Sequence, residues 1–190
     1  MENRDSQVLA ERKKALEEQF FARQEKELRE RVRRQAAEQA RRAGLAEASG
    51  LEDPAVLDRL AGLGLDGETV TALELVPLVE VAWADKILHQ GEREAVLRAA
   101  DESGIGAGSP AHALLESWLE HRPSRELVRA WKDYVEALVA ELGPEERRAL
   151  REEVLGRARA VAEAAGGFLG MGKVSEAERA VLAELEAAFG

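Results

Sequence analysis

An uninterrupted run of helix-forming residues most constrains the fold of this chain. Residues 6–43 contain neither Gly nor Pro and consist mainly of Glu, Arg, Lys, Gln and Ala, all of which favour helices. Glu and Arg recur four positions apart, as in Glu25 and Arg29, and such pairs stabilise a solvent-exposed helix. The run therefore predicts a long exposed N-terminal helix within a charged segment over residues 1–47.

The apolar side chains of this helix are too sparse to predict a stable coiled coil, which needs apolar a and d positions over several heptads. The large ones are Leu9, Leu16, Phe20, Phe21, Leu28 and Val32. Adjacent residues lie about 100° apart on a helix, so Phe20 and Phe21 cannot share one narrow buried stripe. We therefore expect the pair to anchor a protein partner or to dock back onto the rest of the chain. Self-association into a homo-oligomer is left open.

The remainder of the chain, residues 48–190, has the pattern of a second domain built from short, capped amphipathic helices. The predicted helices begin at Pro54, span Gly67–Trp83 with a kink at Pro77, span His89–Ser103, begin after Ser109 and Ser124, run from Pro144 to about Ala165, and end with Glu176–Phe189 after a Ser175–Glu178 capping box. No alternating run of β-branched residues predicts a strand. The expected fold is all-α, with seven helices after the N-terminal one.

The two predicted domains differ in charge. Residues 1–47 hold 12 Lys and Arg against 10 Asp and Glu, which leaves 15 basic and 27 acidic residues in the remainder of a chain whose totals are 27 and 37. The second domain is therefore strongly acidic and repels phosphate backbones, and the basic residues of the first alternate with acidic ones. Both features argue against a nucleic-acid ligand.

Several functional classes are disfavoured by what the chain lacks. There is no cysteine, the first residues are too polar for a secretory signal, and the most apolar stretch, Leu73–Ala84, is short and interrupted by Glu74 and Glu80. We therefore expect a cytoplasmic protein without a membrane span. The glycines at 167 and 172 with Lys173 approach a P-loop, but Val174 replaces its Ser or Thr. No catalytic constellation is present, so we expect neither an enzyme nor a bound cofactor.

An internal repeat carries a resemblance to a known family. Residues 86–97 align with residues 172–182 when Glu92 is set opposite Glu178, and in each a Glu-Arg helix follows a short loop. Together with the preceding Val81–Asp85, this pattern resembles the TerB-like (tellurite-resistance) helical domain over about residues 55–189. The resemblance implies a seven-helix body with two similar halves, no catalysis, and a role in stress or metal resistance.

The same resemblance implies a divalent-cation site. Acidic loop residues are suspected ligands in that family, and Asp85 and Glu92 are the matching positions here, whereas Met171 stands where the second half would carry Asp. Two carboxylates suit a hard cation such as calcium or magnesium, which needs six or more oxygens. The alternative interpretation is that Asp85 caps a helix end and Glu92 stabilises the first turn of the next helix.

A second resemblance concerns the N-terminal helix. Residues 17–27, with the sequence EEQFFARQEKE, are similar to the inhibitory helix of the ATP synthase inhibitor protein. This implies contacts to a partner through Glu17, Phe20, Phe21 and Gln24. We therefore expect a non-catalytic TerB-like binding or regulatory module with an N-terminal partner-binding helix, and, as the alternative, an inhibitor of a rotary ATPase.

Overall fold

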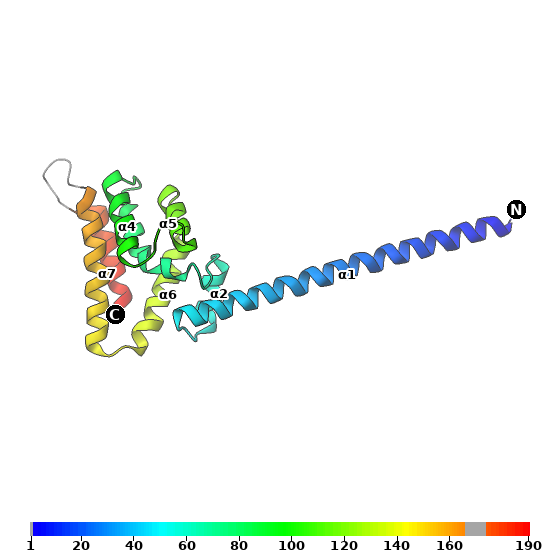
Figure 1. Ribbon diagram of the computed structural model, residues 1–190, viewed down its shortest axis with the longest axis horizontal. Coiled ribbons are helices and arrows are strands. Elements are labelled where there is room, and N and C mark those ends of the chain that lie inside the picture. The colour runs from blue at the N-terminus through cyan, green and yellow to red at the C-terminus, as the bar shows by residue number, and fades with distance from the viewer. Residues whose placement is uncertain (1, 166–173) are drawn as a thin grey trace. The chain divides into compact units, whose positions relative to one another are not determined.

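The computed structural model describes residues 2–165 and 174–190, and these residues form helices and connecting turns without any strand (Figure 1). The elements are α1 (Glu2–Ser49), α2 (Pro54–Gly62), the 3-10 helix η1 (Val70–Leu75), α3 (Val76–Ala82), α4 (Gln90–Glu102), α5 (Pro110–Glu120), α6 (Arg125–Glu141), α7 (Pro144–Ala165), α8 (Glu176–Glu186) and the 3-10 helix η3 (Ala187–Phe189). The predicted all-α class and long N-terminal helix are confirmed. None of the helices in the described ranges is long and apolar enough to cross a membrane.

The chain divides into two compact units, Met1–Ala40 and Arg41–Gly190. The predicted division between residues 47 and 48 falls inside the second unit. The reason is the last part of α1, where the Leu45 side chain is completely buried in the core of that unit and Arg42 forms an ion pair with Asp58 of α2. The second unit therefore begins with the final turns of α1.

The two glycines near the end of α1 have different roles. Gly50 ends the helix with a left-handed backbone (φ 70°), and its N–H donates to the carbonyl of Ala46 at 2.9 Å. Gly44 lies within the helix and does not end it. A Cβ atom at Gly67 would lie only 2.8 Å from the Gly44 carbonyl oxygen, so the two backbones are in close approach. Glycine at position 67 allows the chain to pass this part of α1.

The predicted helix over Gly67–Trp83 is wrong as a single element. Residues 67–69 form a turn held by Asp66, whose Oδ1 accepts hydrogen bonds from the N–H groups of Glu68 and Thr69 at 3.1 Å each. The 3-10 helix η1 follows, and Pro77 lies in the first turn of α3 and produces no kink. Proline is tolerated there because a first-turn N–H has no acceptor within the helix.

The predicted count of seven helices describes the second unit incompletely. Besides α2 to α8, its described residues include the end of α1 and two 3-10 helices, one of them the η3 turn in which the predicted last helix ends. The capping box of Ser175 and Glu178 at the start of α8 is confirmed: Ser175 Oγ accepts from the Glu178 N–H at 3.1 Å, and the Glu178 carboxylate accepts from the Ser175 N–H.

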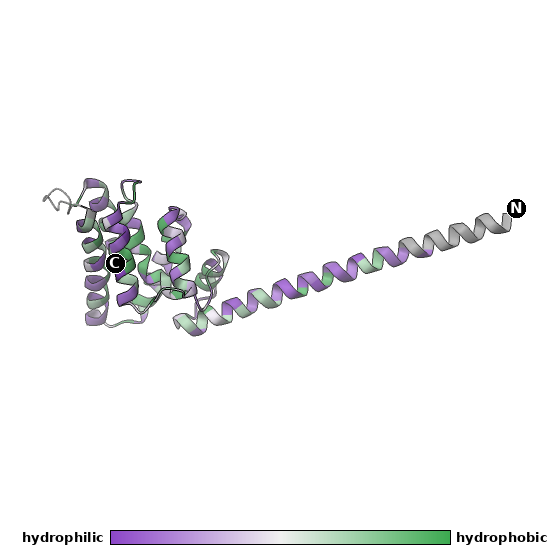
Figure 2. Ribbon diagram, turned by 45° about the horizontal axis from the view of Figure 1, so that its top comes forward, coloured by the Kyte–Doolittle hydropathy of each residue, from purple (hydrophilic) through white to green (hydrophobic). Residues whose placement is uncertain are grey.

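Helix α3 lies at the centre of the second unit. All seven of its residues are buried, and it packs against α4, α6, α7 and α8. Its one charged residue, Glu80, forms an ion pair with Arg122 at 3.2 Å. Figure 2 shows hydrophobic and hydrophilic residues interleaved along the helices of this unit, whereas the coloured part of α1 is mainly hydrophilic with isolated hydrophobic bands.

We predict that Gly67→Ala destabilises the protein by about 1–3 kcal/mol, because the added methyl group would overlap the Gly44 carbonyl and force the backbones apart. Gly62→Ala is the matched control, since no heavy atom lies within 4 Å of a Cβ there. The control should be neutral or slightly stabilising. Urea unfolding of both variants measures the difference, and equal midpoints would contradict the close approach.

Candidate functional site

The loop between α3 and α4 holds the residues that the sequence selected as acidic ligands. Lys86 in this loop has a left-handed backbone (φ 71°), the one positive φ of a non-glycine residue in the described chain. The Asp85 Oδ1 atom accepts a hydrogen bond from the Ile87 N–H at 2.9 Å. Its Oδ2 atom lies 3.5 Å from Nε2 of His89. Asp85 therefore stabilises the turn that carries the chain into α4.

Glu92 stabilises the first turn of α4 from a buried position. Its side chain is only 2% exposed, and its Oε2 atom accepts a hydrogen bond from the His89 N–H at 2.9 Å. Burial raises the pKa of Glu92 to about 7, against the lowering effects of the His89 N–H and ring. The charges of Glu178 and Asp85 raise the pKa further. Glu92 is thus a buried carboxyl group that titrates near neutral pH.

The structure brings Glu92 into electrostatic contact with its counterpart in the repeat. Glu178 is buried at the first turn of α8 and is bonded to the Ser175 N–H, as Glu92 is bonded to the His89 N–H. Helices α4 and α8 both pack in the core around α3 and α7. The two repeats therefore place equivalent capping carboxylates close enough for the charge of Glu178 to disfavour the ionisation of Glu92.

Asp85 accepts its hydrogen bond from Ile87 within the turn before α4 and does not cap a helix end, whereas Oε2 of Glu92 accepts the His89 N–H at the first turn of α4. Glu94 also has a partner, the Gln90 side-chain amide, at 2.8 Å. Within residues 2–165 and 174–190, no three His, Asp or Glu side chains are grouped so as to hold a metal ion. Met171 and the P-loop-like residues Gly167, Gly172 and Lys173 lie outside the described residues. The cation site remains a prediction.

Helix α1 exposes the residues that were expected to bind a partner. The side chains of Phe20 and Phe21 are 57% and 65% exposed, and their rings meet edge to face with centroids 5.9 Å apart. Glu17 and Gln24 are also exposed. The helix thus holds all four predicted partner-binding residues on its surface.

Three of the exposed apolar residues share one narrow face of this helix, which the expectation for the Phe20–Phe21 pair did not include. Leu28 and Val32 are 58% and 55% exposed, and they follow Phe21 by 7 and 11 positions. At about 100° per residue, these three side chains fall within an arc of about 40°, whereas Phe20 lies about 100° away. The spacing of 7 and 11 positions is present in the sequence, but it is too short to meet the criterion for a coiled coil, which requires several heptads. We call Phe21, Leu28 and Val32 the α1 stripe.

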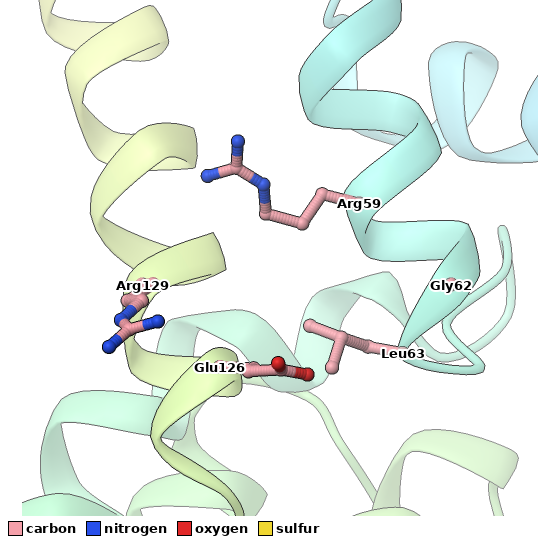
Figure 3. Close-up of a pocket in the computed structure, with 5 residues that line it drawn as sticks. All are labelled: Arg59, Gly62, Leu63, Glu126 and Arg129. Carbon is pink, nitrogen blue, oxygen red and sulfur yellow. The ribbon is translucent and has the colours of Figure 1, made fainter.

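A groove of about 510 Å³ lies between α2 and α6 (Figure 3). It is lined by Arg59 and Gly62 of α2, by Leu63 directly after that helix, and by Glu126 and Arg129 of α6. Arg59 extends towards α6, where it forms an ion pair with Asp133. The side chains that line the groove carry both signs of charge. Its two walls, α2 and α6, are far apart in the sequence, and no local sequence pattern predicts that these helices lie side by side.

Comparisons of the chain with protein-family models, with curated proteins and with solved structures found no match. A functional assignment therefore has to rest on the residues and geometry of the chain itself. The two features that distinguish it are the exposed apolar residues of α1 and the buried acidic caps of the second unit.

We predict that Glu92→Gln flattens the dependence of stability on pH. Because the folded pKa of about 7 exceeds the unfolded value of 4.5, the folded state binds more protons between these values. The free energy of unfolding of the native protein should therefore fall as the pH rises from about 4.5 to 7 and level off above. Gln carries no charge and can still accept the His89 N–H bond. The variant should gain about 1–3 kcal/mol over the native protein at pH 8.

The matched control is Glu94→Gln, an exposed position on the same helix, which should leave the pH profile unchanged. Urea unfolding from pH 4.5 to 8 measures all three proteins. A Glu92→Gln variant that keeps the native slope would show that another group causes the pH dependence.

Proposed function

We propose that this chain is a non-catalytic cytoplasmic binding or regulatory module, in which a helical body carries an N-terminal helix that binds a protein partner. The observation that carries the proposal is the exposure of Phe20, Phe21, Leu28 and Val32 on a helix that is otherwise charged. A solvated helix of Glu, Arg and Gln needs no such residues, and exposed aromatic rings favour association.

The α1 stripe has the spacing of anchors that a helix inserts into an apolar groove. Burying one large apolar side chain in a partner groove contributes roughly 1.5–3 kcal/mol, so each anchor changes the affinity by about tenfold to hundredfold. Phe20 extends the contact to one side, and Glu17 and Gln24 lie at its edge. The alternating charges around these residues would set register and association rate more than affinity.

For the body we propose a TerB-like fold with two similar halves and a stress- or tellurite-resistance-associated role. Three observations support it. Helices α3 and α4 pack against α7 and α8, equivalent buried Glu residues cap α4 and α8, and Lys86 adopts the left-handed conformation where the family pattern has Gly. In this proposal the body is the regulatory part of the molecule and α1 delivers it to the partner.

We predict that replacing Phe20 and Phe21 by Ala abolishes partner binding and leaves the melting temperature of the protein unchanged. A photoreactive residue at position 24 would crosslink the partner in native cells and identify it. The charge-neutral control Lys26→Ala with Glu30→Ala alters the opposite side of the helix from the α1 stripe and should retain the crosslink. A fall of several degrees in the melting temperature of the Phe variant would show instead that the rings have an internal structural role.

The alternative is that α1 inhibits a rotary ATPase. It is favoured by the helical conformation of residues 17–27 and by the exposure of the aromatic pair within them. We predict in that case that the full chain slows ATP hydrolysis by the soluble ATPase head, and that the double Phe variant does not. Unchanged hydrolysis at roughly tens of micromolar chain, a concentration that reveals even weak binding, would eliminate this function.

A further inference from the structure

A second cavity, independent of α1, lies between α6 and α7. Its volume is about 200 Å³, and seven of its lining residues are apolar or aromatic: Trp131, Tyr134, Val135 and Leu138 of α6, Leu150 and Val154 of α7, and Phe189 of η3. Phe189 also meets Trp131 edge to face, with ring centroids 6.3 Å apart. Because apolar cavities of about 150 Å³ bind benzene, this one has room for a single ring or branched alkyl group with a short chain. We call it the α6–α7 cleft.

Acidic residues lie beside these apolar walls. Glu74 of η1 and Glu153 of α7 line the cleft, together with one basic residue, Arg157. The guanidinium of Arg157 is already engaged, since it donates to the Ala99 carbonyl at 2.9 Å and to Ser103 Oγ at 2.6 Å. Neither Glu74 nor Glu153 has a hydrogen bond or ion pair within the part of the chain that the structure describes. The cleft therefore carries a net negative charge with two available carboxylates.

The pKa shifts of Glu74 and Tyr134 agree with the net negative charge of the cleft. Burial raises the pKa of Glu74, Arg157 lowers it, and the neighbouring Glu153 raises it again. Burial also raises the pKa of the Tyr134 phenol, and the charge of Glu74 adds to that effect. A cation bound among these groups would lower the cost of keeping the Glu74 carboxylate ionised.

We propose that the α6–α7 cleft binds a small organic cation, a primary ammonium carried on a single aromatic ring or a branched alkyl group. The ammonium pairs with Glu74 and Glu153, and the apolar part packs against Trp131, Leu138 and Leu150. The Tyr134 ring adds a face that attracts a cation. Binding of an anion is disfavoured because the guanidinium of Arg157 is already bonded to Ala99 and Ser103. A neutral molecule of the same shape would not reduce the repulsion between the Glu74 and Glu153 carboxylates.

Three probes of nearly equal shape test the charge requirement: phenethylammonium, neutral 2-phenylethanol and anionic phenylacetate. The indole N–H signals of the ¹⁵N-labelled full chain report the site, because Trp131 lines the cleft whereas Trp83 and Trp118 do not. We expect phenethylammonium to shift the Trp131 signal with a dissociation constant of roughly 1 mM, typical of a ligand this small. The neutral probe should bind about tenfold more weakly and the anion more weakly still.

Variants of the cleft complete the test. The double variant Glu74→Gln with Glu153→Gln should weaken phenethylammonium binding about tenfold, whereas Glu152→Gln, an exposed neighbour on α7, should not. Leu138→Trp should fill the cleft and abolish binding, with the melting temperature showing that the fold persists. Equal affinity for the neutral probe, or binding that survives the double variant, would overturn cation recognition. Shifts of Trp83 or Trp118 alone, or none at all, would overturn the site.

Discussion

The burial of α3 on all sides is the constraint on which the second unit depends. A helix of seven residues has too few internal hydrogen bonds to be stable alone, so its surroundings hold it in place. Helices α4, α6, α7 and α8 all pack on it, and Pro77 begins it without requiring an acceptor for a missing N–H. Glu80 is tolerated in this setting because Arg122 neutralises it. The short helix thus organises residues from the whole length of the unit.

Polar groups within the unit follow from the same packing. Placing the starts of α4 and α8 in the core buries Glu92 and Glu178, which on an exposed helix would be ordinary caps. Their hydrogen bonds to backbone N–H groups compensate part of the cost of desolvation, and the remaining cost is expressed as the raised pKa of Glu92. At the α6–α7 cleft, by contrast, the carboxylates of Glu74 and Glu153 are exposed beside aromatic walls, and the proposed cation would pair with them there.

The unit that contains most of α1 differs from the second unit because its described side chains are exposed. From Glu17 to Ala40 its side chains are all exposed, and many of them are charged. Within this range four large apolar residues are also exposed, and three of them form the α1 stripe. In the proposed function, the partner-binding residues lie in the first unit and the buried core lies in the second, so substitutions at Phe20 and Phe21 should alter binding without altering stability. The proposed roles, partner binding by the first unit and regulation by the second, depend on this difference in residues.

The sequence by itself determined the features that depend on local interactions. Helix-forming composition over residues 6–43 predicted α1, and Ser175 with Glu178 predicted the start of α8. It located Asp85, Glu92, Phe20 and Phe21, and it placed Glu92 opposite Glu178. Only the tertiary structure determined the features that depend on contacts between residues far apart in the sequence. The approach of Gly67 to Gly44 holds the end of α1 in the second unit, and the turn at Asp66 separates η1 from the predicted long helix. The coupling of Glu92 to Glu178 and the meeting of Glu74 with α6 and α7 arise only when helices pack, because no local pattern specifies which side chains will share one desolvated space.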